Sequence, residues 1–546
     1  MNIDSIRNNV IEKIWNDQQI LKLLVLGSFL IIVIFSSWMC DDAYHGFVMA
    51  KHLIEGNGFV YNIGERVNAA TNPLFILVVA GMDALSGSMY ASATIVSILF
   101  SVLAVVFLLT GFCNNKIQIA EAFVLLCSCK SFMTYTTSGL ENCLLFFLSS
   151  IIMYIVLKND VFDKKQLLYL ALLFSAVAMT RMDNALIYAP LTVYIFIFKR
   201  KNVGFIKGSF IGLTGLMPFL LWEVFSLFYY GSFLPNTAYI KLNTGISSAV
   251  YIERGLEYFG MTFLNDMPVI LLPVAVIILC LGIKDNKYRL IAAGMIFYLL
   301  YLVRIGGDFM LGRHFTVLYF ISSFVMMQVQ TDKGYQGTQS EKRNGIIITG
   351  VFAAIAICSL MLGQIYGKQF LWRQYRATKA GVADEREFYY PHTALMTNIN
   401  SKLVYNKMVV RNIWDEEDID KIREENRKRA LLDWAAGIKV YYNSDLYLQD
   451  PIGLGDPLLS KLPAAEIPEE SFRVGHMYRD IPEGYVESIE NNDNEISDPA
   501  LHEYYDKILL ITRGSLFDEN RIKTIIGMLK GEYDYLLKNY IKGAKK

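Results

Sequence analysis

Long apolar runs limit what this chain can fold into more than any other feature of its sequence. Hydrophobic residues make up 54% of the 546 positions, whereas charged residues make up only 19%. The apolar residues fall in blocks of about 20, which is the length that a helix needs to cross a lipid bilayer. The sequence therefore predicts a polytopic α-helical membrane protein.

The alternation of apolar and polar segments predicts eleven spans. The first, at about 23–39, follows a polar lead and lacks a small-residue cleavage site, so we expect it to remain as a span. Residues 73–85 are apolar but too short to cross about 30 Å of hydrocarbon, so we expect a juxtamembrane or re-entrant helix within an outer loop at 40–90. The other spans are expected at about 91–112, 117–133, 142–157, 166–180, 185–198, 208–228, 267–283, 290–303, 314–329 and 345–364.

The positions of Lys and Arg set the orientation of these spans. Residues 1–22 carry Arg7, Lys13 and Lys22, and short basic flanks stay on the cytoplasmic side of a membrane. In the eleven-span arrangement the inner loops also hold most of the loop Lys and Arg, whereas the outer loops are sparse in both. We therefore expect a cytoplasmic N-terminus and an extracytoplasmic C-terminal region.

The composition changes abruptly after the last expected span. We expect residues 1–366 to form the transmembrane domain, because residues 367–546 are charged, rich in Tyr and free of any 17-residue apolar run. Within that soluble domain the stretch IKVYYN at 438–443 is predicted as a strand. Asp415–Trp434 and Asp518–Tyr540 are predicted as helices, so we expect a small α+β unit.

Charge and motifs exclude several functions. The 51 basic side chains balance the 51 acidic ones, so nothing indicates a nucleic-acid partner. The chain has neither a Walker loop nor a GxGxxG after a strand, and no motif assigns a cofactor. His45 and His52 lie seven residues apart near Asp41 and Asp42, which leaves a divalent metal ion open, although two imidazoles two turns apart cannot share an ion directly.

Polar clusters at the span ends all emerge on the outer side in this arrangement. A charge near hydrocarbon is tolerated mainly where it faces water, protein or a substrate, so the convergence predicts one outward-facing polar cavity. The clusters are Asp41 with Asp42, Glu141, Arg181 with Asp183, Asn236 with Lys241, and Asp308 with Arg313 and His314.

The residue types in these clusters suit the transfer of a sugar. Paired carboxylates can deprotonate an acceptor hydroxyl, and nearby Arg and Lys can hold a phosphate leaving group through charge-assisted hydrogen bonds. Nucleotides are not available outside the cytoplasm. We therefore expect a lipid-linked phosphosugar as the donor.

Seven stretches follow one another along the chain in an order that resembles a known family. They are DDAYHGFVMAKHLIEGNGFVYNIGERVNAATNPL, SGLEN, TRMDN, YYGSFLPNTAYIK, GGDFMLGRHF, DPIGLGDPLLSKLP and FRVGHMYRDIPEGY. Together they resemble the motif set of a bacterial GT-C membrane glycosyltransferase family. The similarity covers about residue 38 to about residue 485 and is closest to the terminal β-(1→2) arabinofuranosyltransferases of cell-wall arabinan.

The resemblance carries specific expectations. It implies a GT-C membrane fold in a bacterial cytoplasmic membrane, a polyprenyl-phosphate donor such as decaprenyl-phosphoryl arabinofuranose, and an extracytoplasmic glycan or glycoconjugate acceptor. It also implies that Asp41-Asp42 is the catalytic carboxylate motif. The chain departs from the family at Met182, where Pro is common, and at His314, where a second Arg is frequent, so the sugar and the acceptor stay open.

Several of these residues also have plain structural interpretations. Asp41 and Asp42 suit a helix end, because Asp is a favoured capping residue. Glu141 suits the positive N-terminus of the span that follows it. Arg181 and Asp183 are close enough in sequence to pair with each other.

The remaining candidates fall into two groups. One group lies in Gly- and Pro-broken outer loops and is expected to contact the donor phosphate or sugar hydroxyls. The other, Asp456 in the GLGDP stretch and His476, belongs to the soluble domain where it folds over the cavity, and either contacts the acceptor or docks the domain. The first group consists of Asn236, Lys241, Asp308, Arg313 and His314.

The sequence therefore favours an inverting, polyprenyl-phosphate-dependent glycosyltransferase with an Asp of the first outer loop as the base. The alternatives are a lipid-linked glycan flippase or transporter, a glycan polymerase or ligase, and a non-catalytic glycan-binding scaffold. A transporter would place polar groups near the bilayer midplane and usually shows an internal repeat, whereas here the polar groups gather at the outer ends and no repeat is visible.

Overall fold

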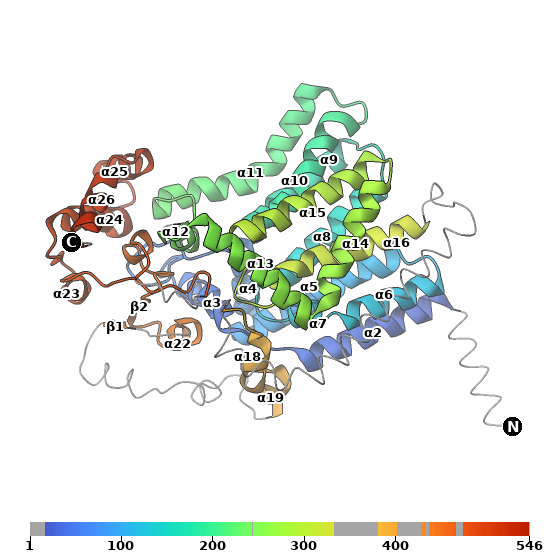
Figure 1. Ribbon diagram of the computed structural model, residues 1–546, viewed down its shortest axis with the longest axis horizontal. Coiled ribbons are helices and arrows are strands. Elements are labelled where there is room, and N and C mark those ends of the chain that lie inside the picture. Colours follow the sequence, from blue (N-terminus) through green and yellow to red (C-terminus); the bar gives the residue numbers. More distant parts are fainter. Residues whose placement is uncertain are drawn as a thin grey trace.

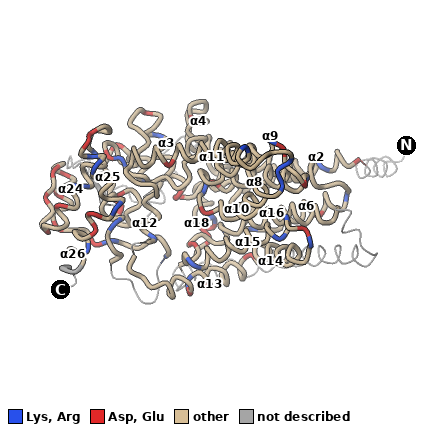
Figure 2. Tube along the Cα trace, turned by 90° about the horizontal axis from the view of Figure 1, so that it is seen from above, with Lys and Arg blue, Asp and Glu red and all other residues tan. Residues whose placement is uncertain are grey.

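The computed structural model describes residues 17–242, 244–331, 381–400, 429–431, 436–465 and 473–544. These residues are largely helical and form an elongated body with helix α2 toward one end and helices α24–α26 at the other (Figure 1). Lys, Arg, Asp and Glu gather around α24–α26, whereas helices such as α10 and α15 are mostly free of them (Figure 2).

The described elements before residue 332 are all helical. In chain order they are α2 (Gln18–Ser36), α3 (Asp41–Ile54), α4 (Pro73–Ser86), α5 (Met89–Gly111), α6 (Lys116–Ser128), α7 (Lys130–Thr134), α8 (Asn142–Leu157), α9 (Lys164–Thr180), η1 (Met182–Asn184), α10 (Ala185–Tyr194), η2 (Ile195–Lys199), α11 (Phe205–Tyr230), α12 (Asn236–Leu242), α13 (Ser248–Asn265), α14 (Met267–Gly282), α15 (Asn286–Arg304), η3 (Arg313–Phe315) and α16 (Thr316–Thr331).

Some of these helices are long and apolar enough to cross a membrane. By length and composition α2, α5 and α11 each meet that requirement, and α13 with α14 would make a fourth span that bends by 110°. The chain is thus a mostly helical protein with three or four candidate spans among its described residues. The expected span at 345–364 lies outside them.

Two of the expected spans are interrupted helices. The span expected at 117–133 consists of α6 and α7, which are separated at Cys129, and the span expected at 185–198 consists of α10 and the π-helical turn η2. The break at Cys129 has a visible cause. Asp266, at the bend between α13 and α14, accepts a hydrogen bond from the Ser131 N–H at 2.6 Å, so this contact joins the break at Cys129 to that bend.

Helix α4 confirms the short helix predicted at 73–85. It begins with Pro73 at the first helical position and ends before Gly87, which adopts the left-handed conformation that terminates helices. Its 14 residues extend about 21 Å at 1.5 Å per residue, which is less than the bilayer thickness. It packs against α3 and α5 and so fixes the helix that carries Asp41 and Asp42.

The described elements after residue 380 are short. They are α18 (Glu385–Thr393), α19 (Leu395–Asn400), β1 (Arg429–Leu431), α22 (Ala436–Tyr442), β2 (Tyr447–Gln449), η5 (Leu459–Lys461), α23 (Tyr485–Asn491), α24 (Pro499–Arg513), α25 (Glu519–Lys530) and α26 (Asp534–Ala544). Strands β1 and β2 pair in parallel, with Arg429 opposite Tyr447.

These elements divide between two hydrophobic cores. Val382, Tyr389, Ile438 and Leu448 belong to the same core as the helices before residue 332. A second core is formed by η5, α23, α24 and α26, around Tyr485 and Tyr505. The boundary expected at 366 lies outside the described residues, and stays a prediction. What the structure adds is that residues well beyond that boundary complete the first core.

Two predictions for this region are wrong. Residues 438–443 belong to helix α22 and the turn after it rather than to a strand, because a distant carboxylate caps the N-terminus of that helix. The helix predicted at Asp518–Tyr540 is two helices, since Gly531 takes the left-handed conformation and ends α25. Of the helix predicted at Asp415–Trp434, the described residues 429–431 form strand β1.

Candidate functional site

A cavity of about 490 Å³ is lined by residues of helix α11, of the segments 68–73, 233–241 and 308–313, and of residues 474–476. One wall is apolar and includes Phe219, Trp222 and Phe233. The facing wall is polar, so a ligand in the cavity would meet both an apolar and a charged surface. Its polar lining consists of Asp42, Asn68, Thr71, Arg181, Asp183, Glu223, Thr237, Lys241, Tyr301, Asp308, Arg313 and His476.

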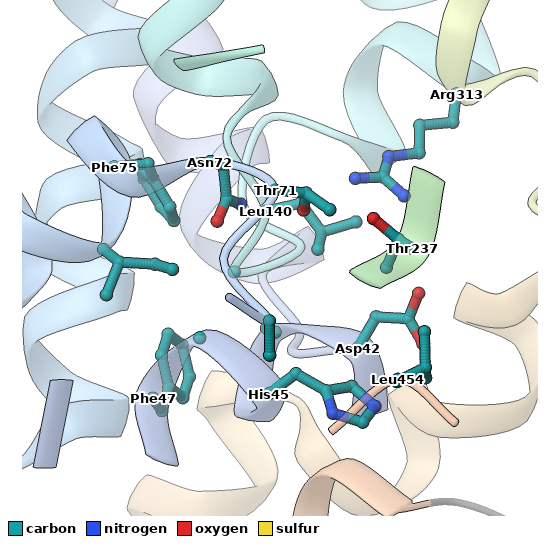
Figure 3. A pocket seen from close by; sticks show the side chains of 15 residues that line it. Asp42, His45, Phe47, Thr71, Asn72, Phe75, Leu140, Thr237, Arg313 and Leu454 are labelled. Carbon is teal, nitrogen blue, oxygen red and sulfur yellow. The ribbon is translucent and has the colours of Figure 1, made fainter. Parts of the chain in front are cut away.

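A smaller pocket of about 90 Å³ adjoins the cavity and shares Asp42 and Arg313 with it. Figure 3 shows these two side chains reaching from opposite sides toward Thr237. The carboxylate of Asp42 and the guanidinium of Arg313 thus face a common space. They come from positions about 270 residues apart in the sequence.

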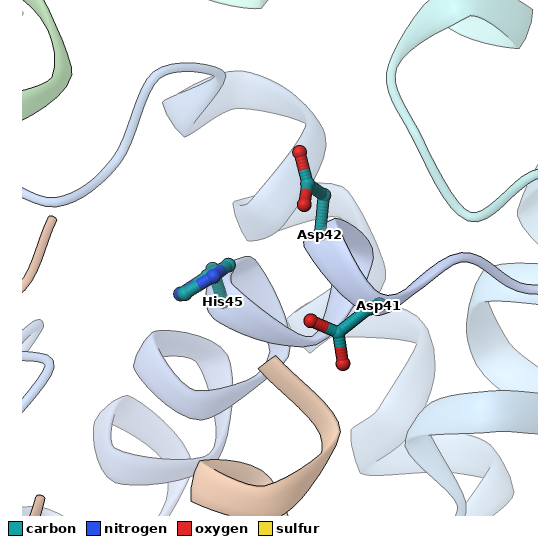
Figure 4. A group of neighbouring side chains, drawn as sticks. All are labelled: Asp41, Asp42 and His45. Atoms are coloured by element: carbon teal, nitrogen blue, oxygen red, sulfur yellow. The ribbon is translucent and has the colours of Figure 1, made fainter. Parts of the chain in front are cut away.

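The two adjacent aspartates have different environments. Both carboxylate oxygens of Asp41 accept hydrogen bonds from the first backbone N–H groups of α22, Gly437 at 3.1 Å and Ile438 at 2.8 Å. Asp42 instead lines the cavity. Figure 4 shows the two side chains leaving α3 in different directions. Asp41 therefore caps α22, a helix nearly 400 residues away, rather than the end of the first span. Asp42 is the carboxylate that faces the cavity.

The protonation of Asp42 suits a base. Burial raises the pKa of its carboxyl to about 6, and the guanidinium of Arg313 limits that rise. A carboxylate with this pKa is mostly ionised at neutral pH yet more basic than an ordinary aspartate. Asp42 can therefore accept a proton from a hydroxyl group placed in the cavity.

Glu141 organises the two arginines. Its Oε1 accepts from Arg181 Nη1 at 2.8 Å and from Arg313 Nη2 at 2.9 Å, and its Oε2 accepts from Asn72 Nδ2 at 2.8 Å. Burial by itself raises the pKa of Glu141, but Arg313 and Arg181 outweigh it and hold the pKa at about 2. Glu141 makes no side-chain cap to α8 and does not line the cavity, so it acts by positioning the arginines.

Arg181 links three neighbours at the end of α9. In addition to its bond to Glu141, Arg181 donates a hydrogen bond from Nε to Asp183 at 2.9 Å. The distance from Arg181 Nη2 to His314 Nε2 is 3.2 Å. The pairing of Arg181 with Asp183 that the sequence suggested is therefore present, and both residues also line the cavity. A structural contact and a substrate contact are compatible here.

The loop at 306–314 supplies three more of the expected residues. His314 Nε2 lies 3.2 Å from Asp308 Oδ2, and Arg313 Nη1 lies 3.9 Å from the same oxygen. Burial raises the pKa of Asp308, yet hydrogen bonding and charge from His314, followed by Arg313, hold it well below its usual range. Asp308 and Arg313 line the cavity, whereas His314 stands behind them and is oriented by Tyr298 at 2.9 Å.

A glycine makes this loop conformation accessible. Gly307 has φ 72°, and a Cβ there would lie 2.5 Å from the Cβ of Tyr258. Any larger residue would push Asp308 away from His314, because the backbone of the loop lies directly on the tyrosine. The Gly-Gly pair before Asp308 is thus a requirement of close packing.

Lys241 reaches the cavity from α12. Within the described residues its Nζ has no hydrogen bond or ion pair. Burial lowers the pKa of the amine, while Asp308 raises it. Its amine is thus placed where it can contact an anionic ligand in the cavity.

Two of the sequence candidates make hydrogen bonds within the chain. Asn236 donates to the carbonyl oxygens of Gly453 at 3.5 Å and Asp456 at 3.0 Å. Asp456 accepts from the N–H groups of Leu458 and Leu459 and from the Tyr485 hydroxyl, and burial raises its pKa to about 7. Of the two roles considered for Asp456, the structure favours docking.

His476 lies on the cavity wall. Its ring meets that of Phe309 edge to face, with centroids 4.3 Å apart. Its Nδ1 is buried and has no hydrogen-bond partner among the residues that the structure describes. Burial, together with the charge of Arg473, lowers the pKa of the imidazole to about 3, so the ring is neutral.

The sequence reasoning missed Glu385 and Arg473. They form an ion pair with a separation of 2.6 Å, and Arg473 also lies over the Phe309 ring. Burial raises the pKa of Glu385 to about 7, although the charge of Arg473 lowers it. The charge of Asp42 raises it as well, so the carboxylates of Glu385 and Asp42 interact electrostatically. Nothing in the local sequence distinguishes these residues from the other charged residues after position 366.

Glu223 was also missed, although the sequence carried a signal for it. It lies within α11, one of the long apolar helices, and it lines the cavity beside Trp222. Its Oε1 is buried without a hydrogen-bond partner in the described part of the chain. An acidic residue inside an apolar span is by itself a reason to expect a functional site.

A metal site would need a different set of ligands from the histidine pair considered above. Asp41, Asp42 and His45 bring their ligand atoms within 4.8 Å of one another. His52 is directed elsewhere, with Nδ1 3.0 Å from the carbonyl oxygen of Val60. Because the oxygens of Asp41 already accept from two backbone N–H groups, this set fits a cation poorly, and we derive no metal chemistry from it.

Comparisons of the chain with protein-family models, with curated proteins and with solved structures found no match. The fold and the cavity therefore define the protein as a largely helical chain with candidate membrane spans and one charged, partly apolar site.

Proposed function

We propose that this protein is an inverting glycosyltransferase that moves a sugar from a polyprenyl-phosphate donor to an extracytoplasmic glycan or glycoconjugate. One observation carries the proposal. In a single cavity the carboxylate of Asp42 faces the cationic side chains of Arg313 and Lys241, and an apolar wall from α11 closes the other side. A phosphate, a sugar and the start of a lipid chain need these three environments together.

The membrane arrangement belongs to the same proposal. We place the chain in a bacterial cytoplasmic membrane in a GT-C-like arrangement of about eleven spans, with the N-terminus inside and residues 367–546 outside. Support comes from helices α2, α5 and α11, which are long and apolar enough to cross a membrane and lie near three of the expected spans. Further support comes from α4, whose length of about 21 Å is less than the bilayer thickness. With α4 counted as part of an outer loop, the proposed arrangement has Asp42 and Asp308 on the same side.

The chemical step follows from the groups in the cavity. Asp42 accepts the proton of an acceptor hydroxyl as the hydroxyl oxygen bonds to the anomeric carbon of the donor sugar. The bond between that carbon and the phosphate oxygen breaks, and its electron pair leaves with the lipid phosphate. Lys241, Arg313 and Arg181 stabilise the negative charge that develops on the phosphate. Attack from the opposite face inverts the anomeric centre.

The proposal is tested with the purified full-length protein in nanodiscs and radiolabelled decaprenyl-phosphoryl arabinofuranose. Asp42→Asn removes the base, and general bases contribute about 10²–10⁴ in rate. Asp41→Asn is the matched control, because it changes the neighbouring residue in the same way but disturbs a helix cap. We expect the Asp42 variant to lose at least about tenfold more transfer activity than the Asp41 variant.

Other results would indicate other functions. Movement of the labelled lipid between leaflets without acceptor-dependent transfer would favour a flippase. Transfer of whole glycan chains would favour a polymerase or ligase. Full activity of the folded Asp42→Asn variant would refute the role assigned to Asp42.

A further inference from the structure

Helix α25 presents a row of apolar side chains that are each about 40–50% exposed. Ile522, Ile526 and Leu529 are 38, 46 and 49% exposed, and their i, i+4, i+7 spacing places them on one face of the helix. Phe517, just before the helix, is 81% exposed. Single exposed apolar residues are ordinary, but a continuous row indicates a partner.

The row is held at a fixed place on the molecule. Arg521, on another face of α25, is fully buried and donates to the carbonyl oxygens of Phe228 at 2.9 Å and Tyr229 at 2.8 Å. These carbonyls belong to the last turn of α11. Gly231, which ends α11, lies so close to Ile525 that a Cβ there would be 3.3 Å from its Cγ1. Helix α25 is thus clamped to the end of α11.

The apolar surface continues from α25 onto α11. Phe517 and Phe228 are in ring contact, with centroids 5.4 Å apart. On α11 itself Leu221 and Val224 are 59 and 64% exposed. Helix α11 is one of the candidate spans, so its exposed face is the one that would meet lipid. Figure 1 shows α25 just beyond the end of α11.

The rest of α25 matches this placement. Lys523 and Lys530 are 67 and 65% exposed at their side chains and lie on the face next to the apolar row. The helix therefore has a buried face, an apolar face and a charged face. Helices that lie in the plane of a membrane interface combine an apolar face with a Lys-containing polar face in this way.

We propose that α25, together with Phe517, lies in the headgroup region of the bilayer at the C-terminal end of α11. The occupant of the apolar row is lipid rather than another protein. The row would hold the second hydrophobic core, which includes α24 and α26, at a fixed height beside the cavity. The inference requires α11 to cross the membrane but does not depend on sugar transfer.

The test places the photoreactive amino acid p-benzoylphenylalanine, by nonsense suppression, at single positions of the full-length protein in phosphatidylcholine–phosphatidylglycerol nanodiscs. The test position is Ile526. The matched control is Asn520, an exposed residue of the same helix outside the apolar row. Val224 on α11 calibrates the lipid adduct that mass spectrometry detects after illumination.

We expect Ile526 to give at least about fivefold more lipid adduct than Asn520, because an interfacial side chain reaches the acyl chains. Its yield should approach that of Val224. A yield at Ile526 no higher than at Asn520 would overturn the proposal. So would crosslinking of Ile526 to a second copy of the chain or to a nanodisc scaffold protein in place of lipid.

Discussion

Glu141 offers the sharpest test of how the cavity is built. The Glu141→Gln substitution keeps the shape of the side chain but removes the negative charge that Arg181 and Arg313 share at 2.8 and 2.9 Å. The Glu141 side chain is only 2% exposed, so solvent cannot replace the lost charge. Two guanidinium groups would then face each other without their common partner.

The pKa of Glu141 gives the size of the effect. A fall from the ordinary value of 4.5 to about 2 corresponds to about 3 kcal/mol of stabilisation of the ionised form in the folded state. Because the folded-state pKa is depressed, this contribution is fully present above about pH 4.5. It is lost as the pH falls through about 2. At pH 7 we therefore expect Glu141→Gln to cost about 3 kcal/mol.

The assay is thermal unfolding of the full-length protein in detergent, followed by tryptophan fluorescence from pH 7 down to pH 3. Glu519→Gln is the matched control, because Glu519 pairs with Lys523 at 2.6 Å while 80% exposed. Such exposed pairs contribute about 0–1 kcal/mol. We expect a melting temperature several degrees lower for the Glu141 variant and little change for the control. Equal melting temperatures for the two variants would refute the reasoning.

Three further predictions follow from the site. Transfer activity should fall tenfold per unit below about pH 6, because Asp42 must be deprotonated and burial raises its pKa to about 6; a pH–rate profile flat down to pH 5 would contradict this. Gly437→Ala should lower the melting temperature, since the added Cβ would lie 2.0 Å from the backbone oxygen of Asp41, whereas Gly260→Ala, with no atom within 4 Å, should not. Glu223→Ala should weaken binding of decaprenyl-phosphoryl arabinofuranose more than binding of decaprenyl phosphate, because the Oε1 of Glu223, which has no partner among the described residues, is placed to accept from a sugar hydroxyl. Native mass spectrometry measures both affinities.

Much of the helical framework follows from apolar periodicity. Helix α8 begins and ends where the apolar run from 142 to 157 does, and α4 is as short as its sequence indicates. Periodicity cannot anticipate an interruption that a distant side chain causes. The break at Cys129 depends on Asp266, which is more than 130 residues away in the chain. The helical state of α22 depends in the same way on Asp41.

In the candidate site, too, the sequence predicted part of the arrangement and missed what distant contacts determine. The sequence predicted that Asp42, Arg181, Lys241, Asp308 and Arg313 would meet, and they line one cavity. It did not separate the roles of Asp41 and Asp42, because neighbours in a sequence look alike until their directions are known. The ion pair of Glu385 with Arg473 had no local signal, since its members are nearly 90 residues apart.

The wall formed by residues 474–476 has a consequence for biosynthesis. Val474, Gly475 and His476 close the cavity that the earlier helices leave open, and Met310 pairs with Ala383 in a parallel bridge. Chains fold from the N-terminus as they leave the ribosome. The helices that carry Asp42 and Arg313 are therefore made long before the residues that complete their site. A chain that ends before residue 474 would therefore lack this wall of the cavity.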